Sequence, residues 1–468
     1  MKFPRRQFLD FAAAATALFA SPYAARAQAQ SPKTVAPPKR SARDRLHEAL
    51  AHIADSKGEG ARACLTVYSQ AARDAADAAD ARVRDGITLG PLDGAIVSIK
   101  DLFDVAGEPT RAGSKVLVDA PPAASDAPVV HRLRAAGAVI VAKTNMVEFA
   151  FSGIGTNPHY GTPGNPADRT RVPGGSTSGG AVAVADGMCE IAIGSDTGGS
   201  TRIPAAFCGL VGFKPSKSRV PTEGAFPLSY TLDSIGPIAK SVAACAAADA
   251  VMAAEDPWTL EPEPLPGLRL GIPQGSPLED LDQTVAARFS DATRELGRAG
   301  VRLSEEVLAL LDDMVRMNAK ATFAAVESYA IHRDRLATRA ADYDPLVLAR
   351  IEGGSTVSAA DYLTMLRGRT ALVRAMDARL ADLDGLVLPT TPIVAPTIAE
   401  VSTSEGFNPR NRLALRNCAI VNYFDLCAIS VPLPRAGGLP VGLMLVARNN
   451  QDHRLFRMAA AVERLFSA

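Results

Sequence analysis

Two clusters of glycine and hydroxyl residues lie close together in the sequence. The first is GGSTSGG at 174–180, and the second is DTGGS at 196–200, after an apolar stretch that predicts a strand over 190–194. Glycines permit backbone geometry that side chains forbid, so Ser200 can stand on a tight turn among free backbone N–H groups. An acyl-transfer nucleophile requires such a turn, because its tetrahedral oxyanion must meet preorganised donors.

One lysine is an unusual candidate for the base that such a serine needs. A serine hydroxyl is a weak nucleophile until a base accepts its proton. Lys100 ends the apolar, strand-like run 95–99, where a lysine is out of character. Burial disfavours the ammonium form and lowers the pKa of a lysine, so a buried Lys100 is a candidate general base.

Other kinds of site have weaker signals. No histidine lies within 173–204, so a Ser/His/Asp triad has no natural histidine. His47 and His52 are five residues apart (52 − 47 = 5), whereas zinc-binding helices of the HExxH type need a spacing of four. The cluster at 174–180 could cradle a phosphate, but it lacks the lysine that completes a P-loop.

From roughly Leu46 to the C-terminus, the sequence resembles the amidase signature family of serine hydrolases. The resemblance rests on Ile99-Lys100-Asp101, on the Gly-Gly-Ser cluster that begins at Gly174, and on Asp-Thr-Gly-Gly-Ser ending at Ser200 with Arg202 after it. In that family the nucleophile lies 24 residues after a bridging serine. Here 200 − 176 = 24, which selects Ser176 over Ser178. Three dispersed elements in order are more specific than any one of them.

The resemblance implies a Ser-Ser-Lys triad. In this triad Ser200 is the nucleophile, Lys100 is the base, and Ser176, which follows a non-proline cis peptide in the family, passes the proton between them. It also implies an oxyanion hole and a set of supporting residues. The oxyanion hole is formed by the backbone N–H groups of Thr197, Gly198 and Gly199, and the supporting residues are Asp196, Arg202 and Ser178. The alternative roles are structural: Ser200 could be a turn serine, Ser176 a polar loop residue and Lys100 a surface lysine.

The function implied by the resemblance is hydrolysis of a small or medium carboxamide to a carboxylic acid and ammonia or amine through an acyl-enzyme. It implies no cofactor and no metal. Two alternatives stay open: a catalytically inactive periplasmic ligand-binding protein of the same fold, and the glutaminase subunit of an amidotransferase. The sequence does not show which amide is the substrate, and it leaves open whether the protein forms a homodimer.

Composition and the N-terminus bear on partners and location. The 468 residues are 47% hydrophobic with a formal net charge of +0, which argues against nucleic-acid partners. Arg5 and Arg6 precede an apolar segment with small-residue cleavage candidates after Ala27 or Ala29. This pattern predicts a twin-arginine signal peptide over 1–29 and a periplasmic location. The apolar segment is about half the ~20 residues of a membrane span, so we expect no stable membrane association.

The rest of the chain predicts an α/β fold with a single large domain, in which helices cover both faces of a mixed central β-sheet. We expect a linker over 30–45 and a catalytic domain over 46–468, with its signature core at about 90–240. The expected elements are helices at 43–54, 71–84 and 128–137, strands at 138–142, 209–214 and 268–273, mostly helix over 278–381, two closing strands from 428 and 438, and an end helix from 452. The six cysteines predict buried thiols, with one periplasmic disulfide as the alternative.

Overall fold

The computed structural model describes residues 40–256, 258–434 and 437–467. The predicted signal peptide over 1–29 and most of the predicted linker lie outside these residues. Arg40–Ala468 form one compact unit. Its first helix takes in residues 42–45, which the sequence assigned to the linker, because Ala42 is buried with Leu46 in the core.

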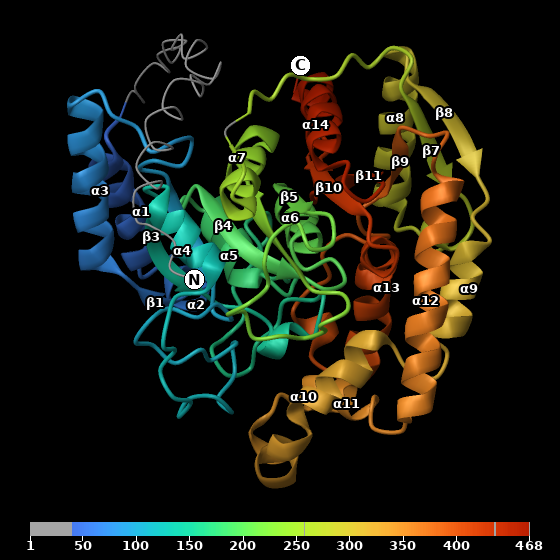
Figure 1. The fold of residues 1–468 in the computed structure, drawn as a ribbon, viewed down its shortest axis with the longest axis horizontal. Coiled ribbons are helices and arrows are strands. Elements are labelled where there is room, and N and C mark those ends of the chain that lie inside the picture. The colour runs from blue at the N-terminus through green and yellow to red at the C-terminus, as the bar shows by residue number, and fades with distance from the viewer. Residues whose placement is uncertain (1–39, 257, 435–436, 468) are drawn as a thin grey trace, which may run out of the picture. The chain divides into compact units, whose positions relative to one another are not determined.

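A single mixed β-sheet runs through the described residues (Figure 1). Its 11 strands, in spatial order, are β1 (Cys64–Val67), β3 (Val139–Thr144), β2 (Ile96–Lys100), β4 (Ile191–Asp196), β6 (Ser234–Ala239), β5 (Val211–Lys214), β10 (Cys427–Pro432), β11 (Gly442–Ala447), β9 (Gly385–Pro389), β7 (Arg269–Pro273) and β8 (Arg302–Glu306). The strands are parallel from β3 to β4 and from β9 to β8, and antiparallel between β4 and β9. This confirms the predicted α/β class.

Helices pack on both faces of the sheet. The α-helices are α1 (Ala42–Ala54), α2 (Gly60–Ala63), α3 (Ser69–Arg84), α4 (Pro128–Ala135), α5 (Ser178–Ala185), α6 (Arg202–Cys208), α7 (Val242–Ala253), α8 (Gln283–Arg298), α9 (Leu310–Met317), α10 (Phe323–Arg339), α11 (Pro345–Glu352), α12 (Ala359–Arg379), α13 (Ser404–Tyr423) and α14 (Asp452–Ser467). Short 3-10 helices are η2 (Glu148–Ala150), η3 (Ser276–Leu278), η4 (Ala340–Asp342) and η5 (Ala399–Val401).

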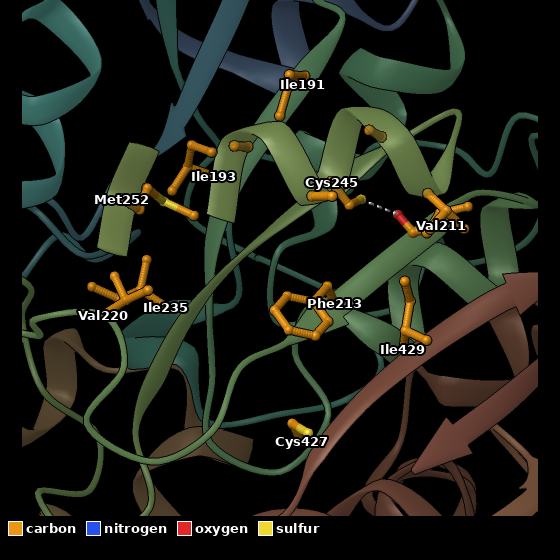
Figure 2. Packing of buried hydrophobic residues seen from close by; sticks show 14 of the residues in the cluster. Ile191, Ile193, Val211, Phe213, Val220, Ile235, Cys245, Met252, Cys427 and Ile429 are labelled. Atoms are coloured by element: carbon orange, nitrogen blue, oxygen red, sulfur yellow. Dashed lines mark hydrogen bonds between the residues drawn. The ribbon is translucent and has the colours of Figure 1, made fainter. Parts of the chain in front are cut away.

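Alternation along the strands divides the core between the two faces, because successive side chains of a strand point to opposite sides. Ile191 and Ile193 of β4 pack with Cys245 and Met252 of α7, as Figure 2 shows. Ala192, between the two isoleucines, packs instead in the cluster that contains α5. The central strands are therefore buried on both sides, which explains why they read as continuous apolar runs.

Four strands were missed by the sequence analysis: β6 and β9, which are buried throughout, and the two edge strands β8 and β1. β8 (Arg302–Glu306) lies within the stretch that was expected to be mostly helical, and its residues are exposed or half-buried at the sheet edge. β1 (Cys64–Val67) occupies the opposite edge. Edge strands need no continuous apolar run, so short strands of this kind leave little pattern in a sequence. None of the described helices combines the length and the apolar character that a bilayer span requires.

All six cysteines are buried, so the structure favours the first of the two sequence interpretations. Burial raises the pKa of the Cys64, Cys189 and Cys418 thiols to about 12. The reactive species is the thiolate, so these cysteines should be inert in the folded protein. We expect a chromogenic disulfide reagent to find essentially no reactive thiol in the native protein and six after denaturation without reductant. A count of four after denaturation would instead indicate a disulfide.

Candidate active site

The predicted site residues come from the ends of two neighbouring strands and the segments that follow them. β2 ends at Lys100, and β4 ends at Asp196. These strands are parallel neighbours, so their carboxyl ends lie at the same edge of the sheet, where α/β proteins place their ligands. The turn after β4 carries Ser200, and the first glycine cluster leads into α5, with Ser176 two residues before the helix. Figure 1 labels β4 and α5.

Lys100 is fully buried and makes two hydrogen bonds. Its Nζ donates to Ser176 Oγ over 2.8 Å and to Ser195 Oγ over 2.9 Å. Burial lowers the pKa of Lys100 to about 7, and the charges of Asp196 and Asp233 only partly oppose this effect. A large fraction of Lys100 is therefore neutral near pH 7, as a general base must be. The sequence analysis did not single out Ser195, because nothing in its local pattern marks it.

Ser176 is held by its backbone as well as by Lys100. The Gly175–Ser176 peptide bond is cis, as the family resemblance implies. The Ser176 carbonyl accepts a hydrogen bond from the Val147 N–H over 3.1 Å, and the Gly175 N–H donates to the Gly153 carbonyl over 2.9 Å. The next residue, Thr177, donates its N–H to the Ser200 carbonyl over 3.3 Å. The two glycine and hydroxyl clusters are thus joined directly.

Ser200 is 3% exposed and follows a glycine that no other residue could replace without strain. Gly199 has a φ of +126°, and a Cβ atom there would lie 2.5 Å from Cys418 Cβ. Residues with a side chain rarely adopt this φ, and the space that a side chain would need at position 199 is already filled. The tight turn predicted for Ser200 is therefore present.

One predicted oxyanion donor is engaged elsewhere. The Gly199 N–H donates to Asp196 Oδ1 over 2.8 Å, because the buried carboxylate needs donors of its own. Within the part of the chain that the structure describes, the N–H groups of Thr197 and Gly198 donate to no protein acceptor. A Cβ atom on Gly198 would meet only Leu415 Cδ2, at 3.5 Å, so Gly198 borders open space. This geometry favours Thr197 and Gly198 over Gly199 as oxyanion donors.

Asp196 and Arg202 form a buried ion pair under the turn. The Arg202 Nη2 atom lies 2.9 Å from Asp196 Oδ1, and the Nε atom lies 3.1 Å from Oδ2. Asn422 of α13 donates to Asp196 Oδ1 over 2.9 Å and accepts from Arg202 Nη2 over 2.7 Å. Burial alone would raise the pKa of Asp196, but Arg202 and Asn422 together hold it well below its usual range. This network therefore fixes Asp196 and Arg202, which lie on either side of the turn that carries Ser200.

Removing one partner of this pair should be costly. We expect Arg202→Met to lower the free energy of unfolding by about 3–5 kcal/mol, because Asp196 would stay buried without its counterion. Denaturant unfolding measures this loss, and Arg294→Met is the matched control, since Arg294 pairs on the surface of α8 with both side chains more than half exposed. A loss below about 1 kcal/mol would contradict the structural role.

Thr197 is anchored by an aspartate that the sequence analysis did not single out. Thr197 Oγ1 donates to Asp233 Oδ1 over 2.5 Å. The other oxygen of Asp233 accepts from the N–H groups of Leu228 and Ser229 over 2.9 and 3.1 Å. Asp233 lies 36 residues after Thr197 in the sequence, so the contact between them depends on the tertiary fold.

The remaining candidates are placed as follows. Ser178, at the start of α5, is buried, and its hydroxyl has no hydrogen-bond partner among the described residues. His47 and His52 are exposed on α1, which fits the surface helix that the sequence favours over a zinc site. Among the described residues, no three histidine, cysteine or acidic side chains converge as metal ligands do.

Comparisons with known proteins show the family to which the chain is similar. A sequence model of the amidase family matches residues 45–456. A 2-amino-5-chloromuconic acid deaminase of Comamonas testosteroni is 38% identical over 84% of this chain and 86% of its own length. The 1-carboxybiuret hydrolase subunit AtzE of Pseudomonas sp. strain ADP is 35% identical over 88% of this chain and 93% of its own length. A crystal structure of an amidase superimposes with a TM-score of 0.82 and 32% identity, covering 91% of this chain and 96% of that one.

Proposed function

The chain belongs to the amidase signature family and is an amide hydrolase, and we propose that it works through a Ser200 acyl-enzyme. The observation that carries this proposal is the 2.8 Å hydrogen bond between Lys100 Nζ and Ser176 Oγ, next to the Thr177–Ser200 backbone contact. A buried lysine with its pKa near 7 that is hydrogen-bonded to Ser176, and a second serine on a tight turn whose carbonyl accepts from the residue after Ser176, are the parts that nucleophilic catalysis needs.

The proposed reaction has two halves. In the first, neutral Lys100 accepts a proton from Ser176 while Ser176 takes the Ser200 hydroxyl proton, and Ser200 Oγ attacks the amide carbonyl carbon. Thr197 and Gly198 N–H groups donate to the resulting oxyanion. Collapse of this tetrahedral intermediate breaks the C–N bond, and the proton held by Lys100 passes through Ser176 to the leaving nitrogen. In the second half, water gives a proton to the same relay and attacks the acyl carbon. The bond between the acyl carbon and Ser200 Oγ then breaks, Ser200 takes the proton back through Ser176, and the acid leaves.

The proposed substrate is a small or medium carboxamide. Support comes from the names of two relatives, a 2-amino-5-chloromuconic acid deaminase and a 1-carboxybiuret hydrolase subunit, each of which names a small molecule with a carboxyl group. Substrates of this size leave most binding energy to a few polar contacts, so the side chains around Ser200 decide which amide is hydrolysed.

An experiment separates this function from the two alternatives. A fluorophosphonate should label Ser200 rapidly, and the protein should release ammonia from primary amides. An inactive ligand-binding protein would do neither, and a glutaminase subunit would hydrolyse glutamine only after addition of its partner. Absence of labelling together with absence of turnover of every amide would refute the proposal.

We also propose that the protein is exported to the periplasm by the twin-arginine route. The support is the sequence pattern alone, with Arg5 and Arg6 ahead of an apolar segment. When the full chain is expressed in a bacterium with this export pathway, a form shortened by signal-peptide cleavage should be recovered in the periplasmic fraction. Replacement of both arginines with lysine should retain it in the cytoplasm, and equal export of this variant would exclude the route.

A further inference from the structure

Glu327 of α10 is a buried carboxylate without a cationic partner. It is 5% exposed, and none of the ion pairs among the described residues includes it. Its two oxygens instead accept four hydrogen bonds. Oε2 accepts from Ser229 Oγ and from the Thr231 N–H over 3.1 Å, and Oε1 accepts from Thr231 Oγ1 and from the Tyr362 hydroxyl over 2.5 Å. Because a buried carboxylate is costly unless donors satisfy it, these contacts tie Glu327 firmly to its donors.

Three of the four donors belong to one turn, residues 229–231. The turn lies outside the helices and strands, so side-chain contacts rather than a regular backbone ladder hold its shape. Lys217 Nζ also donates to the turn, to the carbonyls of Tyr230 and Thr231 over 3.1 and 2.8 Å. Glu327 and Lys217 therefore fix the turn together, through its donors and its acceptors respectively.

The turn is joined to the residue that anchors Thr197. Asp233 lies two residues after the turn, and its N–H donates to the Ser229 carbonyl over 2.9 Å. Its carboxylate accepts from the Ser229 N–H at Oδ2 over 3.1 Å and from Thr197 Oγ1 at Oδ1 over 2.5 Å. Ser229 thus contacts two carboxylates, because its hydroxyl donates to Glu327. A displacement of the turn would therefore move Asp233 and, through it, Thr197.

We propose that Glu327 is a positioning residue for the oxyanion hole: it fixes the turn, and the turn holds Asp233 and Thr197 where the Thr197 N–H can donate to the oxyanion. This inference rests on the proposed function, in which Thr197 is an oxyanion donor. Such donors lower the barrier because they are already oriented when the charge develops. Glu327 lies more than 100 residues after Ser200 (327 − 200 = 127), so a helix remote in sequence from the proposed nucleophile sets the geometry of one donor.

The test is Glu327→Gln, which keeps the shape of the side chain but leaves it one oxygen to accept the four hydrogen bonds. We expect kcat for the best amide of a panel of primary amides to fall about tenfold to hundredfold, below the ~10²- to 10³-fold cost of losing an oxyanion donor outright, with KM nearly unchanged. The rate at which a fluorophosphonate labels Ser200 should fall with kcat, because the same donors face the oxygen that gains charge when phosphorus is attacked.

Glu463→Gln is the matched control. Glu463 is a half-buried carboxylate that accepts the Val242 N–H at the start of α7 over 2.9 Å, and none of its hydrogen bonds reaches the turn. Its replacement should leave kcat and the labelling rate unchanged.

A double-substitution cycle tests the route through Thr197. Thr197→Val removes the hydroxyl that donates to Asp233 and keeps the backbone N–H. If Glu327 acts through this contact, the protein with both Glu327→Gln and Thr197→Val should have a kcat close to that of the more impaired single variant. Losses that multiply would overturn the inference. A Glu327→Gln protein that loses stability to denaturant but keeps its kcat would show a merely structural role and overturn it as well.

The remaining outcomes also decide the question. If Glu327→Gln does not fold, Thr231→Val removes one donor to the carboxylate at nearly constant volume and should lower kcat without raising KM; an unchanged kcat would overturn the inference. If no amide of the panel is hydrolysed, the labelling rate of Ser200 carries the same comparison. Labelling that these substitutions do not slow overturns the inference alone, whereas absence of both labelling and turnover in the unsubstituted protein overturns the proposed function.

Discussion

The Ser200→Ala variant should hydrolyse the best amide of the substrate panel at least about 10⁴-fold more slowly than the unsubstituted protein. Loss of the nucleophile removes the acyl-enzyme route, and the remaining oxyanion donors and binding contacts recover only a small part of the rate. The measurement is ammonia release at saturating substrate, with fluorophosphonate labelling followed in parallel. Labelling should disappear together with activity.

Two controls make this result specific. Ser290→Ala changes an exposed serine of α8 and should leave activity and labelling intact. Ser200→Ala itself removes one hydroxyl from a buried turn, so its denaturant midpoint should stay close to that of the unsubstituted protein. Retention of more than about one hundredth of the activity in folded Ser200→Ala would assign the nucleophile to another residue.

The second large effect is expected from Lys100→Met. The substitution keeps the length of the side chain but removes the base, so kcat should fall on the order of 10²- to 10⁴-fold. In the unsubstituted protein, kcat/KM should rise with pH through about 7, because burial lowers the pKa of Lys100 to that value and the neutral form is the active one. This ionisation should be absent from the residual activity of the variant.

Stability should respond to Lys100→Met in the opposite direction from activity. Because the pKa of Lys100 is lower in the folded protein than its usual 10.5, the unfolded chain binds more protons between about pH 7 and 10.5. Stability linked to Lys100 therefore rises with pH across this window and falls as pH drops toward 7. We expect Lys100→Met to be at least as stable at pH 7, with a flatter dependence on pH. A clearly less stable variant would mean that the Ser176 and Ser195 hydrogen bonds outweigh the cost of burying the charge.

The local pattern of the sequence was enough to predict the α/β class and most central strands. Strands that are buried on both faces, such as β4 and β10, have continuous apolar runs, and each run is read from adjacent residues. The same is true of the candidate catalytic residues. Lys100 stands out because it ends an apolar strand, and Ser176 and Ser200 stand out because glycines surround them at a distinctive spacing. Their chemical roles stay predictions until the variants are measured.

Tertiary structure decided the contacts between distant segments, because a sequence pattern records neighbours along the chain and not neighbours in space. Asn422 reaches the Asp196–Arg202 pair from a helix more than 200 residues away, and Asp233 reaches Thr197 from 36 residues away. The engagement of the Gly199 N–H by Asp196, which changes the expected set of oxyanion donors, also depends on how the turn folds back on itself. The sequence therefore determined which residues are candidates for chemistry, whereas the fold decided which donors remain free for a substrate.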